Sequence, residues 1–328
     1  MGKGWAKNLA SNDKVDLVGW IDVREGAAGA AATEQGLAVP YTGSKLGEAL
    51  IAVSPDFVID VTPPEVHHDV TLQALAFGVP VIGEKPMAAT MEQARAMVRA
   101  SEEAGKLYMV SQSRRYNNCA LGFADLIKKH LGGLGILNSD FYIGAHFGGF
   151  RDEMDHVLIL DMAIHTFDMA RMLSGKNAVA VSAQEFNPDW SWYKGPASAQ
   201  CWFEMEGGLM YNYRGSWCAE GLHSSWEGDW RAVGENGTAL WDGHKDSHGE
   251  VLQESAGFHS TMRAIQSEKR TAKQGIEGSL EDFLLAIETG CTPQGECHDN
   301  INSLAMVCAA VESAIRGQRV EVREILEG

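Results

Sequence analysis

Two short stretches of the chain carry side chains that could move a proton. Lys85 follows the apolar run "VPVIGE", and Asp161 and His165 lie four residues apart in "LILDMAIHTFDMAR". On a helix these two residues share a face, so the carboxylate can fix the orientation and tautomer of the imidazole. Asp168 falls on the same face. Lysine, carboxylate and imidazole are groups that take a proton from a reacting oxygen or stabilise negative charge on it.

Each of these groups also has an ordinary interpretation. A lysine after a strand is commonly an exposed loop residue, and a helical Asp/His pair is commonly a solvated surface pair. The residues around Asp161 and His165 are apolar on almost every side. We therefore expect a buried helix, in which the polar groups need partners.

The first 110 residues alternate apolar runs with amphipathic stretches. The runs are almost continuously apolar and rich in valine and isoleucine, as strands buried on both faces are. This alternation predicts a Rossmann-type, doubly wound parallel sheet with right-handed crossovers. The predicted strands are 14–23, 56–62, 79–85 and 107–113, and the predicted helices are 25–35, 44–53, 65–77 and 90–104.

Beyond residue 115 longer alternating runs predict a second, α+β domain with a large, mainly antiparallel open sheet. Gly207-Gly208 and Asn236-Gly237 are each flanked by alternating runs, which is the pattern of a β-hairpin. We expect a first domain over 1–115 and a second over 116–328, closed by two C-terminal helices. The predicted strands are 135–147, 178–186, 198–206, 208–217 and 229–243, and the predicted helices are 121–131, 158–173, 279–289 and 299–316.

The beginning of the chain resembles the back half of a dinucleotide-binding turn. In such a βαβ unit glycines let the backbone approach the pyrophosphate, and an acidic residue about twenty positions later accepts from the ribose. Gly2 can be the last of these glycines, "GWAKNLA" the helix after it, and Asp22 the ribose acceptor. Asp22 favours NAD, because a carboxylate repels the 2′-phosphate of NADP, whereas Arg24 could accommodate that phosphate.

Composition narrows the classes of partner. A formal net charge of −17 disfavours nucleic acid and anionic membranes, so we expect a small-molecule substrate. The six cysteines form no CxxC pair and no ordered Cys/His spacing, which argues against a metal site and against a disulfide framework and favours a cytoplasmic protein. The chain has no apolar run of membrane-spanning length and no signal-peptide pattern in its first segment.

The order of motifs resembles a known family. "TPPEVHHDV", "GEKPMAAT", "SQSRRYN" and "DMAIHTFD" follow the βαβ beginning, and the chain closes with "LEDFLLAIETGCTPQG" and a final helix. Together they resemble the Gfo/Idh/MocA family of NAD(P)-dependent oxidoreductases along nearly the whole chain. The resemblance implies oxidation of a secondary alcohol of a sugar, glycoside, inositol or related polyol, or the reverse reduction.

The resemblance also implies roles for particular residues. Lys85 matches the lysine that contacts the substrate hydroxyl and the nicotinamide ribose, and Asp161 with His165 matches the acid/base pair. We expect His165 to act as the base, although its role and that of Lys85 can be exchanged. Thr62, Pro63 and His67 match the turn over the nicotinamide half of the cofactor, and Glu84 matches the residue beside the lysine that approaches the ribose.

Four residues are candidates for substrate binding. Arg115 matches the arginine that follows the last strand of the family's first domain. Arg151 and His156 lie just before the Asp161 helix, and Trp192 belongs to a tryptophan-rich segment suited to apolar sugar faces. Arg115 and Arg151 could equally be structural salt-bridge arginines.

Two other functions are compatible with the sequence. A non-catalytic sugar or dinucleotide sensor could use the same scaffold without turnover. A metal-dependent hydrolase could use Asp161, His165 and His156, or His244 and His248, but these residues show no ordered ligand spacing.

Two further expectations concern assembly and the beginning of the chain. A broad antiparallel sheet with one face on helices leaves the other face to cover, so we expect a homo-oligomer, a dimer or tetramer. The first strand of the doubly wound sheet and the first two glycines of its turn are absent from the printed sequence. This should leave a gap between the strands at 14–23 and 56–62. We expect Met1 to be an internal methionine of the turn, with about ten more residues in the working protein.

Overall fold

The computed structural model describes residues 2–255 and 257–328. The chain forms two compact units, Met1–Ser113 with Gly275–Ile301 and Arg114–Gln274 with Asn302–Gly328. The sequence placed 275–301 in the second domain, whereas this segment packs into the first unit. An amphipathic pattern shows that a helix has a partner but does not say which unit supplies it.

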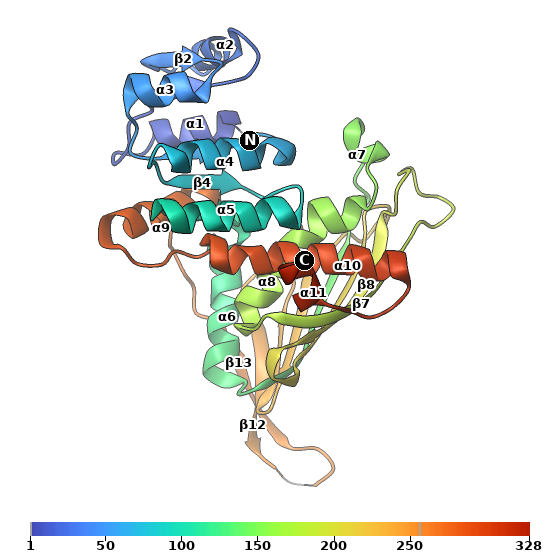
Figure 1. Ribbon diagram of the computed structural model, residues 1–328. Helices are drawn as coiled ribbons and strands as arrows, with labels where there is room; N and C mark the ends of the chain where they lie inside the picture. Colours follow the sequence, from blue (N-terminus) through green and yellow to red (C-terminus); the bar gives the residue numbers. More distant parts are fainter. Residues whose placement is uncertain (1, 256) are drawn as a thin grey trace. The chain divides into compact units, whose positions relative to one another are not determined.

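The first unit contains short parallel strands that alternate with helices, as predicted (Figure 1). All four residues of β4 and all four of β5 are buried, which explains their continuous apolar runs. The elements are α1 (Gly2–Ala10), β1 (Gly19–Ile21), α2 (Ala27–Glu34), β2 (Tyr41–Gly43), α3 (Leu46–Val53), β3 (Val58–Asp60), α4 (Pro64–Ala76), β4 (Val81–Glu84), α5 (Met91–Ala104), β5 (Tyr108–Ser111) and α9 (Gly275–Thr289).

The strands of this unit belong to two separate sheets. β1 pairs with β2, whereas β3, β4 and β5 form a three-stranded sheet in that order. Among the described residues no hydrogen-bonded ladder joins β1 to β3. The predicted gap between these strands is therefore confirmed. The parallel direction of every pair confirms the predicted sheet type.

Helix α1 is anchored by the side chains on one of its faces. Trp5, Ala6 and Leu9 are buried, whereas the residues between them are largely exposed. The indole of Trp5 is one of the largest fully buried side chains of the chain. This helix is the one that the sequence placed after Gly2.

The second unit is built on a nine-stranded sheet, with strand order β13-β12-β11-β10-β6-β9-β8-β7-β14. β6 and β9 are parallel and all the other neighbours are antiparallel, so the predicted sheet is confirmed. Both predicted hairpins are present, β8–β9 and β10–β11. The strands are β6 (Leu134–Tyr142), β7 (Ala178–Phe186), β8 (Ser198–Met205), β9 (Met210–Ser216), β10 (Asp229–Gly234), β11 (Gly237–Trp241), β12 (His248–Glu254), β13 (Thr261–Gln266) and β14 (Val320–Glu321).

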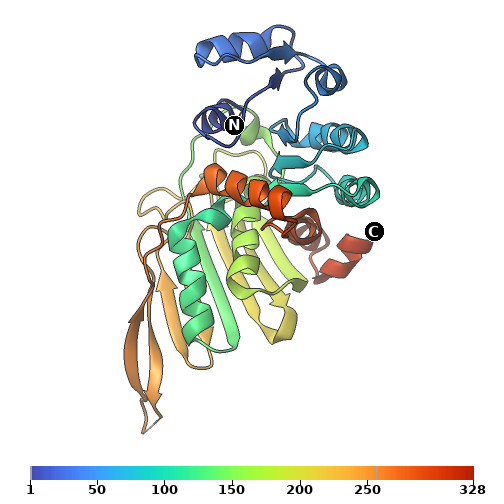
Figure 2. The same cartoon turned by 90° about the vertical axis from the view of Figure 1, so that its left-hand side faces the viewer.

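Helices cover one face of this sheet (Figure 2). They are α6 (Asn118–His130), α8 (Ile164–Ser174) and α10 (Cys297–Arg316), of which α10 begins in the first unit. α7 (Phe150–Glu153) and α11 (Val322–Glu327) are short. On β8 the indole of Trp202 is 56% exposed, and Val179 and Phe186 on neighbouring β7 are also exposed. This sheet therefore presents apolar side chains to solvent.

The expected helix over 158–173 consists of two pieces. Leu158–Ala163 form a π-helical turn, η2, and α8 continues from Ile164 to Ser174. The wider π-helical turn changes the angular spacing that a uniform 3.6-residue period predicts for positions 161, 165 and 168. π-helical turns inside α-helices often occur at functional sites.

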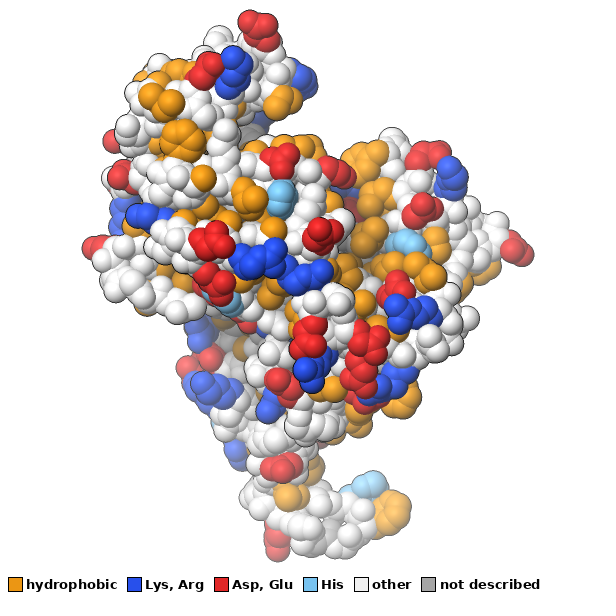
Figure 3. Space-filling model, viewed as in Figure 1, with side chains coloured by type: hydrophobic (Ala, Val, Ile, Leu, Met, Phe, Trp, Pro, Cys, Tyr) orange, Lys and Arg blue, Asp and Glu red, His pale blue; other side chains and the backbone are white. Residues whose placement is uncertain are grey.

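Charged side chains of both signs lie on the surface (Figure 3). Figure 3 shows acidic and basic side chains interspersed over the visible face, in a chain whose formal net charge is −17. Across the described residues, no helix combines the length and apolar character needed to cross a bilayer.

Candidate active site

The carboxyl end of β4 carries the Glu84-Lys85 pair. Glu84 is the last residue of the strand and is only 7% exposed. The buried indole of Trp5 donates from Nε1 to Glu84 Oε1 at 2.7 Å. Burial raises the pKa of the Glu84 carboxyl, while the bond from Trp5 opposes that rise. The indole fixes the side chain immediately before Lys85, whose own side chain is half-buried.

His67 ties the turn after β3 to the segment after β4. Its Nε2 lies 2.7 Å from the carbonyl oxygen of Thr62, and its Nδ1 lies 2.9 Å from that of Pro86. The imidazole is 1% exposed, and Pro86 follows Lys85 through a cis peptide bond. This buried ring therefore holds together two loops at the carboxyl edge of the parallel sheet. The family resemblance placed His67 beside the cofactor, and the structure gives it a positioning contact to both loops.

Asp22 follows β1, at the carboxyl end of the strand. Its carboxylate accepts from Arg24 at both oxygens, from Nε at 3.0 Å and from Nη2 at 2.8 Å. The Arg24 guanidinium and the Arg24 backbone N–H lower the pKa of Asp22 to about 2. The carboxylate is therefore ionised at neutral pH. Arg24, the candidate for a 2′-phosphate, is occupied by Asp22 itself.

In the second unit, Asp161 lies on the π-helical turn. Its Oδ2 accepts from Arg151 Nε at 2.6 Å, and the Asp161 side chain is 18% exposed. The guanidinium of Arg151 also lies over the rings of Phe147 and Phe150, at 4.9 and 4.7 Å from their centroids. Arg151 thus links an aromatic surface to the carboxylate of the candidate acid/base pair. His165 is half-buried in α8, four residues beyond Asp161.

His156 is held by a buried carboxylate on the sheet. Its Nδ1 lies 2.5 Å from Glu185 Oε2, and the Glu185 side chain is 3% exposed. Burial raises the pKa of the Glu185 carboxyl, and the contact with His156 opposes this. His156 has a backbone φ of 52°, in the left-handed region that side-chain-bearing residues rarely adopt. No motif pointed to Glu185, which lies 29 residues from His156 on β7.

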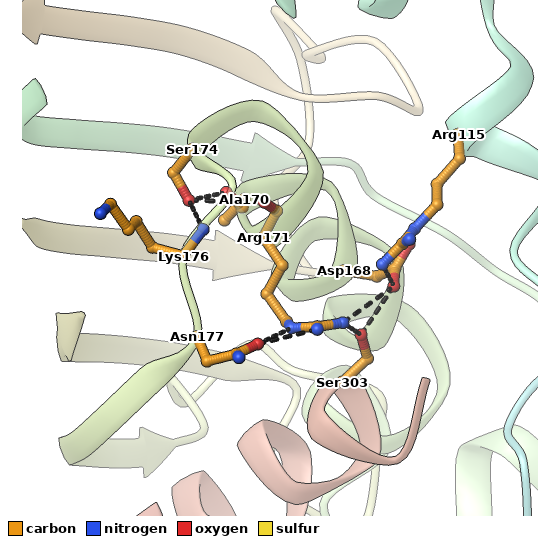
Figure 4. A network of polar contacts seen from close by, with 8 residues as sticks. All are labelled: Arg115, Asp168, Ala170, Arg171, Ser174, Lys176, Asn177 and Ser303. Atoms are coloured by element: carbon orange, nitrogen blue, oxygen red, sulfur yellow. Dashed lines mark hydrogen bonds and ion pairs between the residues drawn. The ribbon is translucent and has the colours of Figure 1, made fainter. Parts of the chain in front are cut away.

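Arg115 lies in a buried network (Figure 4). Its Nε and Nη2 each donate to Asp168 at 2.7 Å, in the bidentate geometry of an arginine–carboxylate pair. The Oγ of Ser303 donates to Asp168 at 2.6 Å, and Arg171 donates to Ser303 at 2.8 Å and to Asn177. The side chains of Arg115 and Asp168 are 8% and 3% exposed. Of the two roles left open for Arg115, this geometry favours the structural one.

The neighbouring Arg114 is the arginine that sequence reasoning passed over. Its guanidinium donates to the carbonyl oxygen of Trp226 and lies 3.6 Å from Met162 Sδ, on the π-helical turn. A carboxylate oxygen of Glu227 lies 3.6 Å away. Burial lowers the pKa of Arg114 and raises that of Glu227. The sequence signal was present in "SRRY", but adjacent arginines cannot be told apart without their partners.

Trp192 lies in a cluster of rings. It stacks on His146 with ring centroids 3.7 Å apart and an interplanar angle of 14°, and its Nε1 donates to Ala145 O at 3.3 Å. Exposed Trp190, Phe147 and Phe150 belong to the same unit. Trp192 is therefore a half-buried ring, in a segment rich in aromatic side chains.

Comparisons with known proteins agree with these features. Residues 1–112 match the family model described as "Oxidoreductase family, NAD-binding Rossmann fold", and residues 152–322 match the model of its C-terminal alpha/beta domain. The chain belongs to the Gfo/Idh/MocA oxidoreductase family. It is therefore an NAD(P)-dependent oxidoreductase on a Rossmann-type scaffold, which confirms the fold and family that the motifs indicated.

Relatives match either nearly all of the chain or about half of it. An uncharacterized protein, y4oX, of Sinorhizobium fredii is 28% identical over 99% of this chain and 94% of its own length. An inositol 2-dehydrogenase of an Arthrobacter species is 31% identical over 48% of this chain and 46% of its own length. An oxidoreductase from Agrobacterium radiobacter, solved with NAD+, L-tartaric acid and magnesium, has the same fold. Its TM-score is 0.86 at 20% identity, covering 99% of this chain and 96% of that one.

The first unit fits a dinucleotide. Its donors and acceptors lie at carboxyl ends of parallel strands and at a helix N-terminus, where dinucleotides bind in such sheets. They comprise the backbone N–H groups at the start of α1, the ionised Asp22, the turn at Thr62-Pro63, and Glu84 with Lys85. The predicted site residues thus form two groups, the candidate cofactor residues in the first unit and the candidate acid/base pair Asp161 and His165 in the second.

Proposed function

We propose that this chain oxidises a secondary alcohol of a sugar, glycoside, inositol or related polyol, or reduces the corresponding ketone, with NAD or NADP. A bound nicotinamide would accept or supply the hydride. The observation that carries the proposal is the Lys85 motif itself. Its glutamate is pinned by Trp5 and its proline carbonyl is held by His67.

Residues of this chain would transfer the proton of the substrate hydroxyl. His165 would take the hydroxyl proton, and Asp161, held by Arg151, would orient the imidazole. Lys85 would donate a hydrogen bond to the same oxygen and stabilise negative charge on it. Lys85 and His165 could exchange these two roles.

We propose that NAD is preferred over NADP. Asp22 is ionised at neutral pH, because Arg24 lowers its pKa to about 2. An ionised carboxylate at the end of the first βα unit accepts from ribose hydroxyls and repels a 2′-phosphate. The pairing of Arg24 with Asp22 also competes with any phosphate for that guanidinium.

Substrate recognition would come from the second unit. Arg151, His156 and Trp192 bring a cation, an imidazole held by a carboxylate and an aromatic ring, groups that recognise hydroxyls and apolar sugar faces. Arg114 joins this set because it reaches the same π-helical turn as Asp161. The inositol 2-dehydrogenase relative makes inositols the first substrates to test.

The test is a turnover assay that separates an enzyme from a sensor. Inositols, aldoses and other polyols are offered with NAD and then with NADP, and the appearance of reduced nicotinamide is followed by its absorbance. We expect turnover with at least one polyol and a higher kcat/KM with NAD. If a polyol binds together with the dinucleotide and no reduced cofactor forms with any member of the panel, the chain is a sensor and the proposal fails.

A further inference from the structure

A loop in the first unit closes the edge of the parallel sheet. After α9 the chain runs along β5, where the N–H of Val110 donates to the carbonyl oxygen of Gly295 at 2.8 Å. Met109 and Glu296 form an isolated antiparallel bridge. Helix α10 then begins at Cys297. The residues at this junction lie outside the candidate active site described above.

Three different metal-ligating side chains converge at the junction. The Sγ of Cys297 lies 2.9 Å from Glu296 Oε1 and 3.5 Å from His298 Nδ1. Glu296 Oε1 and His298 Nδ1 are 2.8 Å apart. Cys297 is buried, Glu296 is half-buried and the His298 side chain is 52% exposed. A thiol, a carboxylate and an imidazole therefore face one point that solvent can reach from the histidine side.

A second carboxylate, on another helix, orients the imidazole. Glu102 on α5 has its Oε1 2.9 Å from His298 Nε2. Metal-bound histidines typically donate their second ring N–H to a carboxylate, which fixes the tautomer and the ring direction. With Nε2–H donating to Glu102, His298 would offer Nδ1, the atom that faces Cys297 and Glu296, to a bound cation.

We propose that Glu296, Cys297 and His298 bind a thiophilic divalent cation of the zinc class. In a tetrahedral zinc site, ligand atoms of these three kinds lie roughly 3.3–3.6 Å apart. The observed separations of 2.8, 2.9 and 3.5 Å approach this spacing, and small rotations of the two polar side chains would complete it. Binding would release the thiol proton of Cys297, and water would take the fourth position.

The cation would act as a clamp. It would connect the loop that runs along β5, the start of α10 and, through Glu102, helix α5. This is a structural role in the first unit and is independent of the proposed dehydrogenase reaction. A cation that binds only the folded chain also raises its apparent stability.

The test uses the full chain, stripped of metal with a chelator and then titrated with Co²⁺ alone. We expect one Co²⁺ per chain and a thiolate-to-cobalt charge-transfer band in the near ultraviolet, and then displacement by Zn²⁺. In competition with a chromophoric chelator, Glu102→Gln should weaken Zn²⁺ binding about 10–100-fold. Zn²⁺ should raise the melting temperature of the wild-type chain.

Substitutions identify which side chains bind the cation. Cys297→Ser should abolish the band, and because that side chain is buried, the exposed His298→Gln provides a second test on a surface position. His298→Gln should weaken Zn²⁺ binding by at least the roughly 10–100-fold that the loss of an outer-shell partner costs, and should remove the Zn²⁺-dependent rise in melting temperature. Exposed Cys291, in the same loop, is the matched control, and Cys291→Ser should keep the band. Absence of a band in the wild-type chain, its persistence in Cys297→Ser, or unchanged Zn²⁺ affinity in His298→Gln would overturn the proposal.

Discussion

Replacing Arg115 with alanine distinguishes a structural role of this arginine from a role in substrate binding. The substitution removes two 2.7 Å hydrogen bonds from the carboxylate of Asp168. The carboxylate keeps the hydroxyl of Ser303, and Arg171 remains 4.0 Å away. The Asp168 side chain is 3% exposed, so its charge would be left without its main partner in a medium that solvates it poorly.

The burial of Asp168 determines how much folding stability Arg115→Ala should lose. Removing one partner of a buried ion pair destabilises a protein by about 3–5 kcal/mol. That is a large part of the roughly 5–15 kcal/mol that separates a folded domain from its unfolded state. Removing both partners should cost less than the sum of the two single losses, because Arg115→Ala with Asp168→Ala leaves neither member of this pair buried without the other.

Urea unfolding followed by tryptophan fluorescence measures this effect. Of the nine tryptophans only Trp5 and Trp20 lie in the first unit, so the signal reports mainly on the second. Arg214→Ala is the control, because Arg214 forms an ion pair with Asp140 in the same unit but is 59% exposed. Its expected cost is about 0–1 kcal/mol. If Arg115→Ala unfolds at the same urea concentration as the wild type but binds polyol poorly, Arg115 has no structural role and binds substrate instead.

Two further predictions follow from the fold. Burial raises the pKa of Glu84 above 4.5, so the stability that its protonated form provides is complete below pH 4.5 and is lost as pH rises through the folded pKa. Glu84→Gln can still accept the hydrogen bond from Trp5 and should not show this loss of stability. Parallel curves of stability against pH for the wild type and Glu84→Gln would contradict this prediction. We expect the homo-oligomer to form through the exposed face of the nine-stranded sheet. Trp202→Glu on that face should shift the mass measured by light scattering towards the 35.6 kDa monomer. A mass equal to that of the wild type would exclude this face as the subunit interface.

Local patterns in the sequence predicted much of the fold. The buried runs of β4 and β5 and the turns at Gly207-Gly208 and Asn236-Gly237 depend on neighbouring residues, and these elements form as expected. β12 and β13 escaped prediction because they form an edge ribbon in which most side chains are exposed. Without a buried face, an edge strand shows little alternation between apolar and polar residues.

The site was harder to predict because its contacts are long-range. Trp5 and Glu84 are 79 residues apart, and Arg115 and Asp168 are 53 apart. The motifs identified Lys85, Asp161 and His165 as chemical groups, but motifs do not contain the partners that hold them. The sequence could not distinguish the roles of Arg114 and Arg115 for the same reason. Only the fold shows that Arg115 is paired in a buried network while Arg114 contacts the π-helical turn.

We propose that Lys85 acts on the reacting oxygen. The most direct measurement compares kcat with the dissociation constant of NAD in Lys85→Ala, with Lys106→Ala as an exposed lysine control in the same unit. We predict that Lys85→Ala lowers kcat about 10²–10⁴-fold, that NAD affinity changes far less, and that Lys106→Ala retains the wild-type values. Unchanged turnover in Lys85→Ala would contradict the account.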